Sequence, residues 1–95
     1  MLENYFSFCN ELRLMVGKYK PGEVVDLVFI VPMPNSWSAK RKALMNTKPH
    51  QQRPDVDNLC KSFLDALCKD DSYVYDLHAV KLWGYEGEID ILNYS

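Results

Sequence analysis

At the start of its strongest helical pattern the chain reads Arg53-Pro54-Asp55-Val56-Asp57-Asn58-Leu59-Cys60-Lys61. Two carboxylates therefore stand on alternate residues, with a lysine one helical turn further along. Carboxylates this close repel each other, so a fold that keeps them together needs a compensating charge. A hard divalent cation such as Mg²⁺ provides that charge, because it prefers carboxylate and water oxygens as ligands. The stretch indicates a candidate metal site.

A second acidic pair, Asp70-Asp71, follows the helix. If Asp71 returns alongside Asp55 and Asp57, three carboxylates surround one cavity, which is enough for one or two Mg²⁺ ions. Lys61 would then stand where an ammonium group neutralises charge on a phosphate under attack. We therefore expect Asp55, Asp57 and Asp71 to bind metal and Lys61 to assist phosphodiester cleavage. The simpler alternative is a helix cap, an ordinary i,i+4 charge pair and an acidic turn.

The composition is that of a small globular protein. The 95 residues are 47% hydrophobic and 25% charged, which argues against disorder and predicts one domain. No apolar run approaches the roughly 18 residues that span a membrane, and no signal-peptide pattern opens the chain. Cys9, Cys60 and Cys68 fit no metal-ligand spacing and are expected to be free thiols. These features predict a soluble, cytoplasmic protein without a membrane partner.

The net charge of −2 hides an uneven distribution. No acidic residue lies between Asp26 and Asp55, and that interval carries +5 while the rest of the chain carries −7. A basic segment that leads into an acidic cluster suits a phosphate-binding metal site, although a solvated basic loop would look the same. The candidate DNA-backbone contacts are Lys40, Arg41, Lys42, Lys48 and Arg53.

The first half of the chain alternates helix and strand signals. Helical spacing runs from Leu2 to about Lys18, and residues 24–33 read as a strand apolar enough to be buried on both faces. Ser36 or Ser38 is expected to cap a short helix over residues 39–45.

The second half predicts a long helix and two strands. Asp55 or Asp57 is the expected N-cap. Strands are expected over residues 73–83 and 88–94, paired as a hairpin. Together the elements predict an α/β (α+β) fold with helices packed on a small mixed sheet. The apolar stripe of the helix is expected to be Leu59, Phe63, Ala66 and Leu67, with Leu64 beside it.

Residues 53–67, with the core Pro54-Asp55-Val56-Asp57-Asn58-Leu59-Cys60-Lys61, closely resemble the RusA family of Holliday-junction resolvases. The likeness covers roughly residues 24–93. The resemblance implies that Asp55, Asp57, Lys61 and Asp71 are catalytic. The connection from Asp65 to the Asp70-Asp71 pair is shorter than in some members, which leaves open whether Asp70 or Asp71 faces the metal. It extends upstream through residues 32–38 and 48–50, and downstream through 70–72 and the strand that carries Lys81.

The resemblance also implies the wider activity. RusA-like enzymes cut four-way (Holliday) DNA junctions symmetrically, as homodimers that depend on Mg²⁺, in recombination and repair; Mn²⁺ is the alternative ion. Members commonly begin with a proline-rich strand, whereas this chain starts inside the first helix. We therefore expect residues 1–95 to form one RusA-like endonuclease domain, either with a sheet that lacks this edge strand or as a shortened version.

Two other functions stay open on the sequence. One is a non-catalytic module that binds branched DNA and keeps the acidic loop as a helix cap. The other is a shortened family member that acts as an interaction protein through an exposed sheet edge. Trp37 and Trp83 are expected to pack against the core or a dimer partner rather than stack on bases. His50 is expected to sit idle in its loop rather than contact phosphate.

Overall fold

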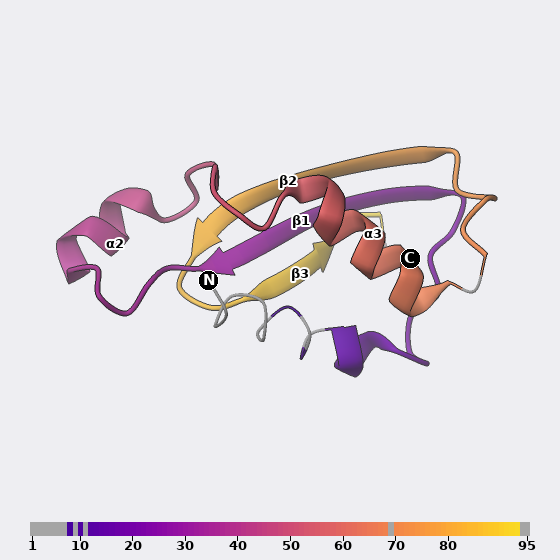
Figure 1. The fold of residues 1–95 in the computed structure, drawn as a ribbon, viewed down its shortest axis with the longest axis horizontal. Helices are drawn as coiled ribbons and strands as arrows, with labels where there is room; N and C mark the ends of the chain where they lie inside the picture. The colour runs from indigo at the N-terminus through magenta and orange to yellow at the C-terminus, as the bar shows by residue number, and fades with distance from the viewer. Residues whose placement is uncertain (1–7, 9, 11, 69, 94–95) are drawn as a thin grey trace.

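The computed structural model describes Phe8, Asn10, residues 12–68 and residues 70–93. Residues 12–15 are helical, in agreement with the expected first helix; the remainder of that prediction lies largely outside the described residues. The fold is α+β with a small mixed sheet, as the sequence predicted. In chain order the elements are β1 (Val24–Pro32), α2 (Ala39–Met45), α3 (Val56–Leu67), β2 (Asp76–Gly84) and β3 (Glu88–Ile91) (Figure 1).

The three strands have the order β2-β1-β3. β1 pairs with β2 in parallel, from Val24 opposite Asp76 to Pro32 opposite Gly84, and with β3 antiparallel. The predicted β2–β3 hairpin is therefore wrong. β1 is the most continuously apolar strand. Because it lies in the centre of the sheet, its backbone is hydrogen-bonded to a neighbouring strand on each side.

The connection from β2 to β3 depends on a glycine. A Cβ atom on Gly84 would collide with the Cγ2 methyl of Ile30 on β1. The carbonyl of Gly84 also accepts a hydrogen bond from the Met33 amide at 3.0 Å, just beyond the end of β1. A residue without a side chain therefore lets the chain leave β2 close to β1 before it turns back as β3.

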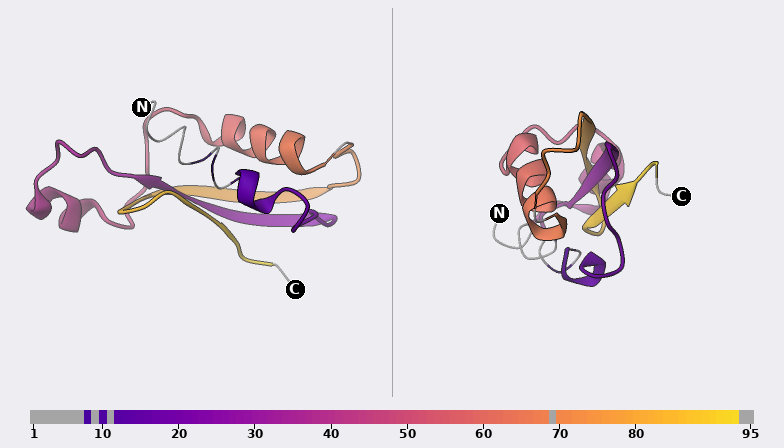
Figure 2. Two further views of the ribbon diagram at one scale, coloured as in Figure 1. Left: turned by 90° about the horizontal axis from the view of Figure 1, so that it is seen from below. Right: turned by 90° about the vertical axis from the view of Figure 1, so that its right-hand side faces the viewer.

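Only one face of β1 is fully covered. Its buried residues alternate with half-exposed ones such as Val28 and Ile30, so the predicted burial on both faces is wrong. The physical reason is visible in Figure 2, where α3 lies along one face of the sheet. The covered face of β1 consists of Val25, Leu27, Phe29 and Val31.

The face of α3 that packs on the sheet is rotated from the predicted stripe. Cys60 and Leu64 are buried, whereas Ala66 is exposed and Leu67 is half-buried. Leu59 and Phe63 are buried as predicted. These side chains form the main core with the covered face of β1, so the free energy of burial fixes how α3 presents its polar residues.

α2 lies beyond the end of the sheet (Figure 1). The Ser38 hydroxyl accepts a hydrogen bond from the Arg41 amide at 3.1 Å, so Ser38 is the N-cap. A small second core joins this region to the sheet, with the rings of Trp37 and Trp83 4.8 Å apart. Both tryptophans pack as predicted. Within the described part of the chain, no helix is both long and apolar enough to cross a membrane.

Candidate active site

Three of the four predicted catalytic residues line one pocket between α3 and β2. Asp57 and Lys61 come from α3, and Asp71 comes from the turn that follows it. The pocket has a volume of about 410 Å³. Its remaining walls are apolar, so the charged groups stand at the edge of a hydrophobic hollow. The apolar walls are formed by Val56, Cys60, Leu64, Leu77 and Ala79.

Asp57 and Lys61 project from exposed positions on successive turns of α3. Asp57 lies in the first turn, where the helix dipole favours negative charge, and its Oδ1 accepts a hydrogen bond from the Asn58 amide at 3.0 Å. The Nζ atom of Lys61 lies 3.6 Å from Oδ2 of Asp65, one turn further along. Both side chains are therefore held only by local contacts and are free to engage a ligand.

The two adjacent aspartates after α3 have different surroundings. Oδ1 of Asp70 accepts a hydrogen bond from the Ser72 amide at 3.0 Å, and this bond lowers the pKa of Asp70. The Asp71 carbonyl accepts a hydrogen bond from the Val74 amide at 3.0 Å, which closes the turn. It is Asp71 that lines the pocket. The sequence left open which of the two faces the site, and this arrangement favours Asp71.

Asp55 is the N-cap of α3 by its backbone, but its carboxylate makes no capping hydrogen bond. Its carbonyl accepts the first helical hydrogen bond, from Leu59 at 3.1 Å. Asp55 does not line the pocket of Asp57 and Asp71. Among residues 12–68 and 70–93, with Phe8 and Asn10, no group of three or more acidic, histidine or cysteine side chains could hold a metal ion. The three-carboxylate ligand set therefore stays a prediction.

The carboxylates that line the pocket are of the kind that binds a hard cation. Mg²⁺ is commonly bound through one or two protein carboxylates and keeps several waters, and Asp57 with Asp71 supplies that number at a solvent-exposed edge. The Cys60 thiol also lines the pocket. Burial first, and the charge of Asp57 second, raise the pKa of Cys60, so sulfur stays protonated and is a poor ligand.

Lys81 is not among the site residues that the sequence predicts. Its Nζ atom donates hydrogen bonds of 2.6 Å to the carbonyls of Gln52 and Pro54, immediately before Asp55. Burial lowers the pKa of Lys81, and the Asp55 carboxylate opposes that shift. The sequence signal that could have found it is a lysine at the alternate position after Leu77 and Ala79, on one face of the expected strand.

His50 is buried rather than idle in a loop, so that expectation is wrong. Its side chain is 4% exposed and packs edge-on against Trp83, with ring centroids 4.3 Å apart. Neither ring nitrogen has a hydrogen-bond partner. Burial, and then the charge of Lys81, lower the pKa of His50 to about 4. The imidazole is therefore neutral at pH 7 and plays a packing role.

The five basic residues predicted to contact DNA are mostly exposed. Three of them lie on α2, where the Arg41 guanidinium stacks 4.0 Å from the ring centre of Trp37. Lys48 and Arg53 lie on the segment between α2 and α3. Whether they bind DNA stays a prediction. The α2 residues are Lys40, Arg41 and Lys42.

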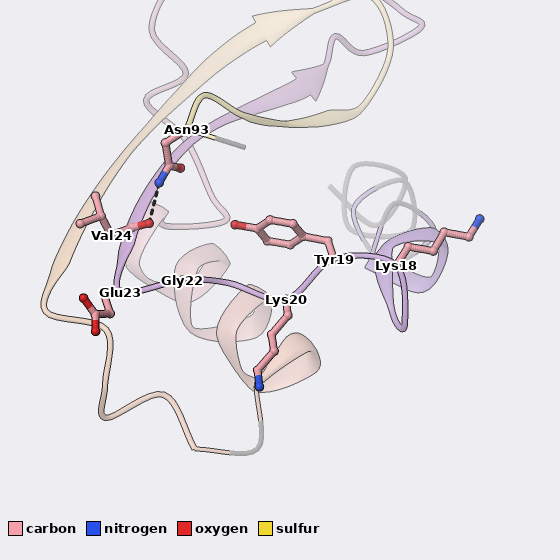
Figure 3. A pocket seen from close by; sticks show the side chains of 7 residues that line it. All are labelled: Lys18, Tyr19, Lys20, Gly22, Glu23, Val24 and Asn93. Carbon is pink, nitrogen blue, oxygen red and sulfur yellow. Dashed lines mark hydrogen bonds between the residues drawn. The ribbon is translucent and has the colours of Figure 1, made fainter. Parts of the chain in front are cut away.

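A larger pocket, of about 650 Å³, is lined mainly by the segment that leads into β1. Figure 3 shows that Lys18 and Lys20 project in different directions from it. Asn93 closes one side through a hydrogen bond of 2.6 Å to the Val24 carbonyl. Glu23 is the single acidic residue among the lining residues, so this pocket has no paired carboxylates.

The fold and the acidic pocket define a small α+β protein with carboxylates and a lysine gathered beside a helix. The family model for endodeoxyribonuclease RusA matches residues 10–92, and the chain belongs to this family of Holliday-junction resolvases. It is also 30% identical over 99 residues to the uncharacterized protein YqaN of Bacillus subtilis, which covers 90% of this chain and 70% of that protein. No solved structure gives a significant match.

Proposed function

We propose that the protein is a Mg²⁺-dependent, structure-selective endodeoxyribonuclease that resolves four-way DNA junctions in recombination and repair. One observation carries the proposal: Asp71, from the turn after α3, lines one pocket with Asp57 and Lys61 of α3. Membership of the RusA family supports a nuclease function for that pocket. Mn²⁺ is the expected alternative ion.

The residues of the pocket have distinct roles in this proposal. Asp57 and Asp71 would hold the cation, with Asp55 beside them at the start of α3. When bound, Mg²⁺ supplies Lewis-acid stabilisation of charge on the phosphate and on the leaving oxygen. The Lys61 ammonium adds positive charge where the phosphorus carries an extra oxygen during attack by water. The water oxygen would bond to phosphorus and the bond between phosphorus and the 3′ oxygen would break, while the proton that the water loses is balanced by one that the leaving 3′ oxygen gains.

The DNA would be positioned by charge and by symmetry. Basic residues of α2 and of the segment that follows it would contact backbone phosphates, which orient DNA without reading its sequence. A homodimer would place two acidic pockets against two strands of a junction. Phosphate contacts from both subunits would make the affinity for DNA fall steeply as the salt concentration rises.

The test is cleavage of a synthetic four-way junction with Mg²⁺, Mn²⁺ or Ca²⁺. The wild type should cut with Mg²⁺ or Mn²⁺ and stop when the metal is chelated. Asp57→Asn should abolish cleavage and leave junction binding within a few-fold, whereas the exposed control Asp76→Asn should cut at the wild-type rate. Cleavage by Asp57→Asn at the wild-type rate would contradict the assignment of Asp57 as a metal ligand.

A second candidate is a non-catalytic module that binds branched DNA. It is favoured by one observation: the described residues hold no group of three potential metal ligands. Such a module would bind the junction with salt-dependent affinity and give no product in any of the three metals. The same assay therefore separates the two candidates.

A further inference from the structure

We propose that Lys81 is a positioning residue, whose ammonium group fixes residues 52–54 and so sets where Asp55 stands at the start of α3. Its Nζ atom donates to the carbonyls of Gln52 and Pro54, and both distances are 2.6 Å. An ammonium group has three donors, and two of them are used on carbonyls either side of Arg53. The side chain thereby clamps the segment that leads into the acidic site.

The backbone around Lys81 strengthens this clamp. The Lys81 carbonyl accepts a hydrogen bond from the His50 amide at 3.0 Å. The Trp83 amide donates to the Lys48 carbonyl at 2.9 Å. Residues 48–50 therefore pair with the end of β2, and the Lys81 side chain continues the same attachment up to Pro54.

A lysine at this position needs a compensating role. Lys81 stands in register with Phe29 of β1 and Ile89 of β3, on the face of the sheet that α3 covers. Lys81 is partly buried, and moving an ammonium group partly out of water costs free energy that an apolar side chain would not. The hydrogen bonds to two carbonyls offset this cost, since bonds from a charged donor are the stronger kind.

The clamp matters for Asp55 because no capping hydrogen bond holds the Asp55 carboxylate in place. The side chain makes no capping hydrogen bond, so its position follows from the backbone of Pro54 and of the first turn of α3. Groups that orient the ligands of a metal, without touching the metal, are usually as necessary as the ligands. Lys81 has this relation to Asp55.

The inference rests on the proposed metal site, but its first test does not need activity. In the protein without metal, NMR order parameters of amides at residues 52, 53 and 55 should fall from about 0.85 to below about 0.6 in Lys81→Met. Lys81→Arg keeps the charge and the donors and should restore order. The exposed control Lys20→Met should change nothing. If Lys81→Met does not fold, Lys81→Gln, which removes the positive charge and carries its two N–H donors on a shorter side chain, replaces it.

The second test uses Mg²⁺ alone as the probe. Lys81→Met should weaken Mg²⁺ binding, followed by NMR, by roughly 10–100-fold, the usual effect of losing an outer-shell partner. In an Asp55→Asn background the same change should have little further effect, because Lys81 acts through Asp55. Unchanged order, or an effect that adds in full to Asp55→Asn, overturns the inference. A wild type that binds Mg²⁺ but cuts no junction refutes the proposed function and leaves this test standing.

Discussion

Nζ of Lys61 lies 3.6 Å from Oδ2 of Asp65, and the two side chains are 77% and 60% exposed. An exposed pair of this kind contributes little to stability, because water and salt screen it and both side chains lose freedom. Lys61 is therefore available to the pocket at almost no energetic cost, and its ion pair with Asp65 does not make its role purely structural.

The first prediction separates Lys61 from its partner. Asp65→Ala should change the free energy of unfolding by less than about 0.5 kcal/mol and keep the cleavage rate. Lys61→Met should lower the rate at saturating junction at least about tenfold, because it removes charge from the site. Urea unfolding and single-turnover cleavage measure the two effects. Equal losses of cleavage rate in the two variants would mean that the ion pair, rather than the Lys61 charge alone, supports cleavage.

The second prediction concerns the two adjacent aspartates. Asp71→Asn should abolish metal-dependent cleavage, because Asp71 lines the pocket with Asp57. Asp70→Asn should retain it, because the Asp70 carboxylate is engaged with the Ser72 amide. Junction cleavage with the two matched variants is the measurement. The reverse result would place Asp70 at the metal.

The third prediction is a loss of stability in acid due to His50. Its pKa is about 4 in the folded protein against 6.5 for the free side chain, so below pH 6.5 the unfolded chain binds a proton that the folded chain does not. Stability should fall as the pH falls from about 6.5 to 4, by at most about 3 kcal/mol, and His50 should contribute no further change below that range.

The measurement is urea unfolding at pH 7 and pH 4.5. His50→Phe should reduce the pH dependence and cost little at pH 7, because it removes two buried nitrogens that lack partners. His78→Gln is the matched control, since His78 is exposed and pairs with Asp26 at 3.0 Å. If His50→Phe loses as much stability between pH 7 and pH 4.5 as the wild type, groups other than His50 cause the loss.

The fourth prediction tests the close approach at the end of β2. Gly84→Ala should destabilise the fold by about 1–3 kcal/mol, because the added methyl meets the Cγ2 atom of Ile30. In an Ile30→Ala background the same substitution should cost much less. Gly22→Ala, where a Cβ would meet nothing within 4 Å, is the control. Thermal unfolding compares the variants, and equal losses for Gly84 and Gly22 would contradict the prediction.

Local signals in the sequence were sufficient for the helices and for the family. Ser38 caps α2 and Asp55 stands at the N-cap of α3, because capping depends on a few neighbouring residues. The Asp-x-Asp motif with its lysine identified the RusA family, which the family comparison confirms. The packed face of α3 was predicted only in part, because an amphipathic pattern leaves the rotation of a helix open by one residue.

Contacts between distant segments decided the rest. Strand order, burial of His50 and the clamp of Lys81 on Pro54 all join residues far apart in the chain, and no local pattern encodes them. The sequence by itself determined which charged groups are present, and it narrowed the start of α2 and of α3 to two candidate N-caps each. Tertiary structure decided that Asp57, Lys61 and Asp71 share a pocket while Asp55 stands beside it, because packing of α3 on the sheet sets the direction of every polar side chain it carries.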